Sequence, residues 1–585
     1  MTTAKLRIPS FGNRWSTAGR NSSTARTDAP APHRRRPDLR ARIHLLGIVV
    51  GALVLRAYWA VHHGAVLEGN GCEYARIAEN LAKHSAYVGL FEGPELMFPP
   101  FYPVLLALGS FVVGSVDHAA RIIPVVTGVV LVVAAFGLGR VLYGPRVGLT
   151  FAALTAFHPL LIDLSSTAYS EGVYLPLMLG GLYWGLCGLK SGQRRPIVLC
   201  GMAFGLAALT RPEAFFYPLA LLGGSLLSDT GGPSPGRRIV RRALWLMTPM
   251  VIVVAPYAVY VSVHTGSLKF EGKGLMDYTI GTRINAGMNP VEAAFGIGPD
   301  LSEQGPQLSP NHYAATPHPK PSMRAVSHYW LTSARRNWPA LRQALSAPAF
   351  GSFLAIGLVA VGLVGRPWSR WRATGESVLL QVAGGHLLLL LGLHFVLPRY
   401  MFPLLLISML WVAKGIDEVA WWSLGTTRRA LSGHRWPELR LANGARGALI
   451  IGILLLALWG VHGVPLQDQG PEDRLLRDVG TWLDDYHAGP KRIMTIHPEV
   501  AYYSGGTWLP LPYAEASLSL RYIRRKHPDF IVLTGMGRAA PYLSQWLEHG
   551  IPANAARLIY RAGPASPAAV AIYEWRAQPP GLPEN

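Results

Sequence analysis

Acidic side chains gather in the polar segment that follows the first long apolar stretch of the chain. Glu68, Glu73, Glu92 and Glu95 lie in this segment, and Asn70 precedes Glu73 by about one helical turn. A carboxylate within hydrogen-bond reach can take the proton from a hydroxyl group as its oxygen attacks an electrophilic carbon. Glu73 is the predicted base of such a reaction. The alternative, which the residues leave open, is that Glu73 only solvates the surface of a helix.

A second pair of acids lies further along the chain. Asp163 and Glu171 flank the short polar segment 164–170. We predict that Glu171 supports the site as a second acid, and both side chains are candidates to complete a metal or acceptor site. The alternative for Glu171 is a helix N-terminus, where a carboxylate interacts favourably with the helix dipole.

Three arginines at the ends of apolar stretches are candidates to bind a phosphate group. They are Arg121, Arg211 and Arg399, and Tyr400 follows the last of them. A charged side chain at a membrane boundary is costly unless it is paired or used. A phosphate leaving group departs as an anion, so it needs cations or a divalent metal rather than a general acid. The alternative is that these arginines extend to the lipid headgroups.

Apolar stretches of membrane-spanning length separate these residues. The 585-residue chain is 50% apolar and only 15% charged, whereas soluble proteins carry about 25% charged residues. We therefore predict a polytopic α-helical membrane protein with about eleven transmembrane helices. The predicted spans are 44–63, 119–142, 147–164, 172–189, 196–210, 212–228, 243–263, 347–365, 376–397, 400–416 and 447–463.

The formal charge of +21 reflects basic clusters on alternate loops, which is the positive-inside pattern of membrane proteins. Accordingly, no nucleic-acid partner is predicted. The polar, basic residues 1–43 are predicted to form a disordered cytosolic tail. The same charge pattern places the first outer loop, 64–117, and the C-terminus on the extracytoplasmic side. It also predicts that the apolar helix at 100–116 does not cross the membrane.

Two further segments are predicted on the extracytoplasmic side. The long outer loop 265–345 either covers a cavity or forms a solvated linker. Residues 465–585 are predicted to form a small α/β domain. Its helices are expected at 471–486, 516–526 and 542–549, and its strands at 492–496, 530–533 and 570–573. The domain has no glycine-rich phosphate motif, so docking or acceptor recognition is a more suitable role for it than catalysis.

Cysteine and histidine spacing points to neither disulfides nor zinc. Cys72, Cys187 and Cys200 form no disulfide framework. The histidines follow no HExxH pattern or Cys/His spacing typical of a structural zinc site.

Six short phrases in a fixed order resemble a family of membrane enzymes. They are EYARIAENL at 73–81, FPPFYP at 98–103, AR at 120–121, YSEGVY at 169–174, GLAALTRPE at 205–213 and RY at 399–400. This order resembles the bacterial C-type glycosyltransferases, the GT-C superfamily. The most similar group is glycosyltransferase family 39, with the protein O-mannosyltransferases and the lipid A aminoarabinose transferases. The resemblance covers about residues 44–420.

The resemblance implies a transferase of a bacterial inner membrane. Such an enzyme moves a sugar from a polyprenyl- or dolichyl-phosphate carrier to an extracytoplasmic glycan, lipid or protein, with inversion at the anomeric carbon. A first-loop acid acts as the base, often with a divalent metal nearby. That acid stands four residues before the tyrosine that matches Tyr74. Asn70 occupies the position here, so either Glu73 takes the role or the acid is lost.

The remaining site residues follow from the same resemblance. Glu95 corresponds to a second family acid and is a candidate metal ligand. Arg399 and Tyr400 match the late Arg-Tyr pair expected near the lipid phosphate, and Arg211 matches a basic residue of the same cavity. Two alternatives to an enzyme stay open: a transporter or flippase for a lipid-linked sugar, and a non-catalytic scaffold that binds one. The absence of an internal sequence repeat disfavours an inverted-repeat transporter.

Overall fold

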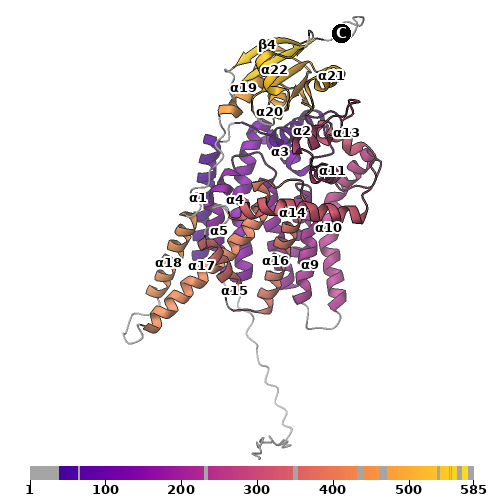
Figure 1. Ribbon diagram of the computed structural model, residues 1–585. Helices are drawn as coiled ribbons and strands as arrows, with labels where there is room; N and C mark the ends of the chain where they lie inside the picture. The colour runs from indigo at the N-terminus through magenta and orange to yellow at the C-terminus, as the bar shows by residue number, and fades with distance from the viewer. Residues whose placement is uncertain are drawn as a thin grey trace, which may run out of the picture.

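The computed structural model describes residues 39–63, 66–228, 235–346, 353–365, 367–430, 440–459, 471–536, 540–552, 554, 556–562 and 569–576. Most of the predicted N-terminal tail, 1–43, lies outside the described residues. The described chain forms a bundle of long helices with a small sheet domain on one end (Figure 1). That end of the bundle is called the capped end below.

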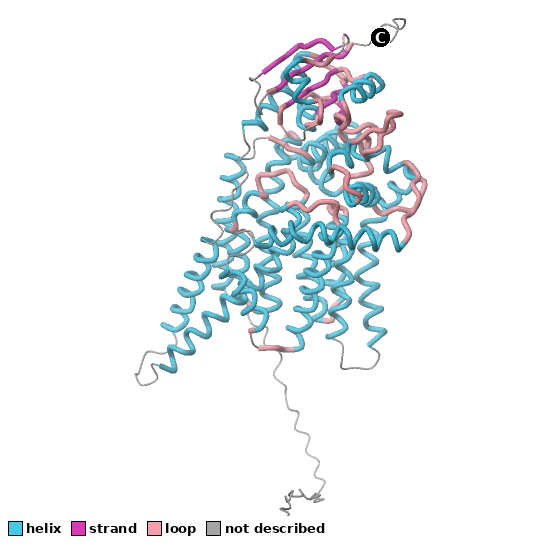
Figure 2. The backbone as a smooth tube through the Cα atoms, in the orientation of Figure 1, coloured by secondary structure: helices cyan, strands magenta, loops and turns pink. Residues whose placement is uncertain are grey.

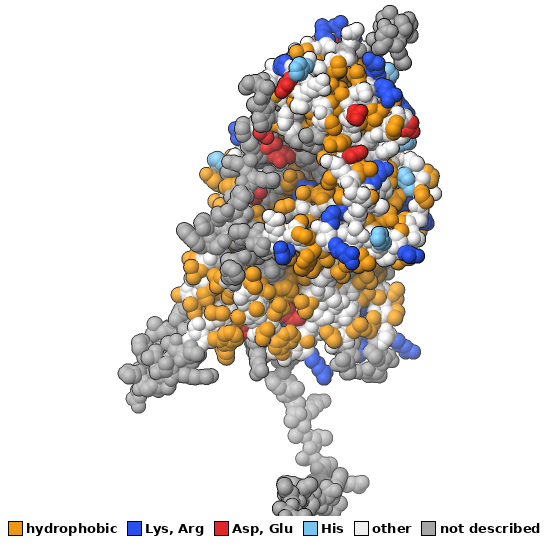
Figure 3. Space-filling model, viewed as in Figure 1, with side chains coloured by type: hydrophobic (Ala, Val, Ile, Leu, Met, Phe, Trp, Pro, Cys, Tyr) orange, Lys and Arg blue, Asp and Glu red, His pale blue; other side chains and the backbone are white. Residues whose placement is uncertain are grey.

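The bundle contains a helix in each of the segments predicted to span a membrane. These helices are α1 (Leu39–His63), α4 (Val116–Tyr143), α5 (Pro145–Phe157) with α6 (Pro159–Asp163), α7 (Glu171–Ser191), α8 (Arg194–Ala208), α9 (Tyr217–Ser228), α10 (Pro235–Thr265), α15 (Phe353–Val364), α16 (Arg370–Gly392), α17 (Phe402–Ala430) and α18 (Arg440–Trp459). Five of the described helices, α1, α4, α7, α10 and α16, are long and apolar enough to cross a membrane. Hydrophobic side chains cover much of the bundle surface below the cap (Figure 3). The chain is therefore a helical membrane protein, while the number of crossings stays a prediction.

Two shorter helices follow α1 at the capped end. Helix α2 (Asn70–His84) packs against α3 (Phe101–Val113), and α3 also packs against α4. Helix α3 starts directly after Pro100 and stops at Gly114, whose φ of 88° few other residues adopt. Its 13 residues span about 20 Å, short of a hydrocarbon core of about 30 Å. Helices α9 and α15, with 12 residues each, are just as short, so whether the segment of α3 crosses the membrane stays a prediction.

The segment between α10 and α15 is folded rather than an extended linker. It contains α11 (Gly274–Asn285), α12 (Pro290–Phe295), the 3-10 turn η2 (Pro306–Leu308), α13 (Pro310–Ala315) and α14 (Met323–Ser346). Helix α14 runs across the bundle in Figure 1 and packs on α16. Asn337 and Arg336 of α14 donate hydrogen bonds to the carbonyls of Leu393 (2.6 Å) and His394 (2.9 Å) just beyond α16. These bonds fix the chain that follows α16.

The C-terminal domain has five described strands and helices around them, as Figure 2 shows in magenta and cyan. In chain order the elements are α19 (Pro471–Tyr486), β1 (Arg492–Thr495), α20 (Pro498–Tyr503), β2 (Thr507–Pro510), α21 (Ala516–Lys526), β3 (Phe530–Thr534), α22 (Leu543–His549), β4 (Ala556–Ala562) and β5 (Val570–Trp575). The strand order is β2-β1-β3-β5-β4, with β1 parallel to β2 and β3, and β5 antiparallel to β3 and β4. Strands β2 and β4 were not predicted from the sequence.

Candidate active site

A cavity of about 610 Å³ opens at the capped end between α2, α7, α11, α16 and two 3-10 turns, η1 (Pro212–Phe216) and η3 (Pro398–Met401). Six residues proposed from the sequence line it: Asn70, Tyr74, Glu171, Arg211, Arg399 and Tyr400. They come from four separate stretches of sequence. The fold therefore brings most of the predicted site residues to one place.

Glu171 holds the two arginines of the cavity together. Its carboxylate accepts a hydrogen bond from Arg211 Nη1 at 2.6 Å and lies 3.6 Å from Arg399 Nε. Arg211 also donates to Glu213 at 2.8 Å. The two short bonds fix the Arg211 guanidinium in position, because charge-assisted bonds of this length are strong. Arg399 lies within ion-pair distance of the same Glu171 carboxylate.

Local sequence explains why these arginines project where they do. Arg211 is extended (φ −149°) directly before Pro212, and Arg399 directly follows Pro398 at the start of η3. Each proline is the first residue of its 3-10 turn, a position where the missing N–H of proline costs no hydrogen bond. The Arg211 guanidinium stacks 5.1 Å from the Tyr400 ring centre, and Arg399 lies 4.6 Å from that of Tyr169.

The long segment between α10 and α15 contributes a third cation and another acid to the same wall. Lys273 and Asp277 both line the cavity. Glu271 accepts the backbone N–H groups of Lys273 and Gly274 at 2.9 Å each, which anchors the start of α11. Burial raises the pKa of Asp277 to about 6, although the neighbouring Lys273 opposes this shift. Asp277 Oδ1 lies 3.6 Å from His394 Nδ1.

Sequence reasoning noted Lys273 and Asp277 as charges at the start of the long outer loop but gave them no role. The only signal was the cluster of charges at 269–277 next to the end of an apolar stretch. Their place on the wall depends on how α11 packs, which no local pattern encodes.

Glu73 is placed differently from the other predicted residues. Its side chain is 3% exposed and does not line the cavity. Its Oε1 accepts the backbone N–H of Leu90 at 2.9 Å, and its carboxyl lies against that of Glu95 beside Gly89. Burial, together with the nearby Glu95 carboxyl, raises the pKa of Glu73 well above its usual range. Glu73 is therefore buried beside Glu95 and points away from the cavity that the other predicted residues share.

Glu95 is held in place by backbone N–H groups of its own loop. Its Oε1 accepts the N–H groups of Met97 (2.6 Å) and Phe98 (3.0 Å), and burial raises its pKa. Among the described residues, no group of three or more His, Cys, Asp or Glu side chains is placed to hold a metal ion. Metal binding by Glu95 stays a prediction.

Arg121 and Asp163 lie away from the cavity wall. Arg121, in the first turns of α4, pairs with Asp117 at 2.8 Å, and both side chains are about one-third exposed. Asp163 accepts a hydrogen bond from Trp59 Nε1 at 3.3 Å. The structure thus brings neither residue to the cavity that Arg211 and Arg399 share.

Comparison with known proteins supports the architecture. Residues 98–260 match the family model described as dolichyl-phosphate-mannose-protein mannosyltransferase. The crystal structure of ArnT from Cupriavidus metallidurans bound to undecaprenyl phosphate is similar, with 14% identity, 91% of this chain and 98% of that chain covered, and a TM-score of 0.54. The chain has the GT-C fold.

A second GT-C structure is similar over most of this chain. It is the archaeal oligosaccharyltransferase AglB from Archaeoglobus fulgidus in complex with an inhibitory peptide and a dolichol-phosphate. The identity is 12%, the alignment covers 94% of this chain and 76% of that chain, and the TM-score is 0.53. A search of curated protein sequences found no match. The GT-C resemblance inferred from the six sequence phrases is confirmed.

Proposed function

We propose that this GT-C protein is an inverting glycosyltransferase that moves a sugar from a polyprenyl-phosphate carrier to an extracytoplasmic acceptor. The observation that carries the proposal is the cluster of Arg211, Lys273 and Arg399 on one cavity wall. Three cations facing one space suit a leaving phosphate, since they stabilise the charge that develops as the glycosidic bond breaks. The similar ArnT structure is bound to undecaprenyl phosphate.

The cavity also has a surface suited to a lipid chain. Leu388, Leu389, Leu393 and Phe395 line it next to the charged wall. Leu388, Leu389 and Phe395 each keep 40% or more of their surface exposed. An apolar margin beside a cationic wall matches a ligand with a phosphate head and a hydrocarbon tail. We place the protein in a bacterial inner membrane with the sheet domain on the extracytoplasmic side, on the basis of the GT-C resemblance and the charge pattern of its loops.

We propose that Asp277 rather than Glu73 takes the proton from the acceptor hydroxyl. Asp277 lies on the cavity wall, and its pKa of about 6 leaves it ionised at neutral pH yet still basic enough to accept a proton. Asn70, on the same wall, can hold a sugar hydroxyl through its amide but cannot act as a base. Glu171 then acts as a positioning residue for the two arginines.

Sugar transfer in membranes tests this proposal. Membranes containing the wild-type chain, Asp277→Asn or Glu73→Gln are supplied with a panel of radiolabelled polyprenyl-phosphate sugars. We expect label to reach a glycan, lipid or protein with the wild type and with Glu73→Gln but not with Asp277→Asn. Loss of transfer in Glu73→Gln alone would return the base to Glu73. Movement of the lipid-linked sugar across the membrane without product would instead favour a transporter.

A further inference from the structure

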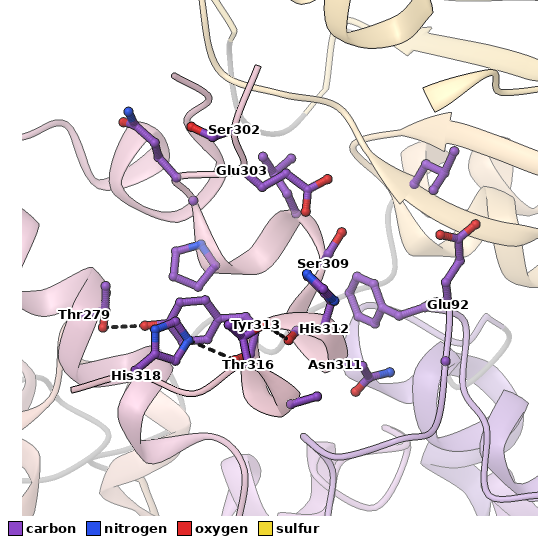
Figure 4. A pocket seen from close by; sticks show the side chains of 18 of the residues that line it. Glu92, Thr279, Ser302, Glu303, Ser309, Asn311, His312, Tyr313, Thr316 and His318 are labelled. Atoms are coloured by element: carbon purple, nitrogen blue, oxygen red, sulfur yellow. Dashed lines mark hydrogen bonds between the residues drawn. The ribbon is translucent and has the colours of Figure 1, made fainter. Parts of the chain in front are cut away.

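A second cavity, of about 1120 Å³, lies above the candidate active site. Its lining comes from three parts of the chain: the loop after α2, the segment from α11 to α13, and the sheet domain. Figure 4 shows labelled side chains that line this cavity. Glu92 comes from the first of these parts. The second part supplies Thr279, Ser302, Glu303, Ser309, Asn311, His312, Tyr313, Thr316 and His318. The name "upper groove" is used for this cavity below.

One helix separates the upper groove from the active-site cavity. Leu275, Thr279 and Arg283 of α11 follow one another at four-residue spacing and line the upper groove. Asp277 of the same helix lines the active-site cavity, and Tyr278 lines both. Residues four apart share a helix face, so α11 is the wall between the two spaces. A ligand in the upper groove therefore lies one helix away from Asp277.

The charged side chains of the upper groove are already engaged with one another or with the backbone. Glu303 pairs with Lys526 at 2.5 Å and accepts a hydrogen bond from Tyr522 at 2.8 Å. Arg525 donates to the Leu301 carbonyl at 3.3 Å. Glu92 pairs with Arg492 at 2.9 Å. Arg283 also lines the groove and donates to the Gln304 carbonyl. Because partners within the chain already hold these charged side chains, the hydrogen-bonding groups left for a ligand are mainly neutral.

The rest of the lining combines aromatic rings with hydroxyl and amide groups. Phe91 and Trp508 form one aromatic wall, with ring centres 4.8 Å apart. Opposite them, Tyr313 stacks on His318 at 4.1 Å and its hydroxyl bonds Thr279 at 2.7 Å. Aromatic faces pack on the C–H faces of sugar rings, while hydroxyl and amide groups bind sugar hydroxyls. This lining matches a neutral oligosaccharide.

A peptide ligand is less well matched, because the sheet offers it no free edge here. Strand β2 is at the edge of the sheet, where an extended peptide would normally add. The Trp508 N–H is already bonded to the Leu90 carbonyl at 2.8 Å, and Tyr513 pairs with Gly296 just beyond the strand. Loops of the same chain cover this edge.

We infer that the upper groove binds a neutral oligosaccharide, which is the acceptor for the transfer proposed above. Only the role of this ligand as the acceptor rests on the proposed function; the binding of an oligosaccharide in the groove does not. The acceptor chain lies in the groove and its terminal sugar passes the end of α11 to bring a hydroxyl to Asp277. The sheet domain then selects the acceptor, since β2 and α21 supply part of the groove.

Saturation-transfer NMR on the full chain in detergent micelles tests the inference. The probes are neutral linear tetrasaccharides of mannose, glucose or arabinose, a Ser/Thr-rich peptide, and undecaprenyl phosphate. The variants are Phe91→Ala and His312→Ala in the groove. His328→Ala on α14 is the matched control, because His328 is exposed like His312 but lies outside both cavities.

We expect at least one tetrasaccharide to bind the wild type and to bind each groove variant about fivefold more weakly, the effect of losing one contact worth about 1 kcal/mol. His328→Ala should bind it normally, and undecaprenyl phosphate should bind all forms equally. The inference is overturned if no tetrasaccharide binds, if the groove variants bind it as the wild type does, or if the peptide binds there instead. Failure of the wild type to bind undecaprenyl phosphate would count against the proposed function and not against the groove.

Discussion

At the scale of single residues, Glu171 is the point on which the cation cluster depends. Its carboxylate contacts both Arg211 and Arg399, and only 4% of the side chain is exposed. We expect Glu171→Gln to raise the KM for the lipid-linked donor about tenfold, because each arginine loses a charge-assisted contact worth about 1–2 kcal/mol. Steady-state kinetics with varied donor would show this. An unchanged donor KM would mean that the arginines hold their positions without Glu171.

The proposal that Asp277 is the base predicts how the rate of transfer depends on pH. A base works only when deprotonated, and the pKa of Asp277 is about 6. We expect kcat/KM to fall about tenfold for each pH unit below 6 and to level off above it. Asp277→Asn should lower the rate by about 10²–10⁴-fold, and the fall in kcat/KM below pH 6 should disappear. A wild-type profile that is flat between pH 5 and 7 would contradict the assignment.

Sequence alone located most of the residues that line the cavity, but Glu73 is not among them. Glu171, Arg211 and Arg399 adjoin the ends of apolar stretches, so their place at the capped end follows from span prediction. On α2, Asn70 and Tyr74 are four residues apart and share a face, while Glu73 lies about 100° around the helix from Tyr74. That rotation turns Glu73 towards Glu95 and away from the cavity. Loop composition does not contain this rotation, so the sequence could not show that Glu73 lies outside the cavity.

At the scale of elements, the buried Glu73–Glu95 pair fixes the loop after α2, and Gly89 leaves it room. A Cβ at position 89 would lie 1.6 Å from Glu73 Oε1 and 3.0 Å from Glu95 Oε2. We expect Gly89→Ala to lower the free energy of unfolding by about 1–3 kcal/mol, since the carboxyl must move. Thermal unfolding in detergent would measure it. Gly357→Ala on α15 is the matched control, because no atom lies within 4 Å of its Cβ position.

The same pair gives stability a pH dependence of known sign. Both carboxyls have pKa values raised by burial. Groups of this kind stabilise the fold at low pH, and the contribution is lost as the pH rises through the raised pKa. We expect Glu73→Gln to become more stable relative to the wild type as the pH increases. Melting temperatures of both forms between pH 5 and 9 would test this, and a constant difference would contradict it.

In the sheet domain, the helices and strands with a clear apolar periodicity were predicted from the sequence. The strands that depend on pairing with their neighbours were not. Helices α19 and α21 and strands β1, β3 and β5 lie where apolar periodicity placed them. Strand β2 has four residues and ends at Pro510, and β4 has no fully buried residue. Neither carries the alternating apolar pattern of a half-buried strand. Both exist because neighbouring strands pair with them.

At the scale of the whole molecule, the sheet domain holds the part of the chain that carries Asn70 and Tyr74. Tyr503 accepts the Leu67 N–H at 2.8 Å, and Glu499 accepts the Gly69 N–H at 2.6 Å just before α2. The Tyr502 carbonyl accepts a bond from Arg76 at 2.9 Å. The domain thereby sets the start of the helix that forms one wall of the cavity. No sequence pattern links residues so far apart in the chain, so this role emerged only from the fold.

This docking predicts that distant tyrosines control the order of α2. The Tyr502 hydroxyl donates a hydrogen bond to the Glu79 carboxylate at 2.9 Å, and the Tyr503 hydroxyl accepts one from the Leu67 N–H. Replacing both with Phe leaves two partly buried groups unsatisfied, at about 1–3 kcal/mol each. We expect trypsin to cleave after Arg76 and Lys83 about tenfold faster in the double variant, because α2 opens more often. Sugar transfer should fall in parallel. Tyr58→Phe, at an exposed position on α1, should change neither rate. Cleavage at the wild-type rate in the double variant would show that α2 is ordered by the bundle alone and that the sheet domain acts only on the acceptor.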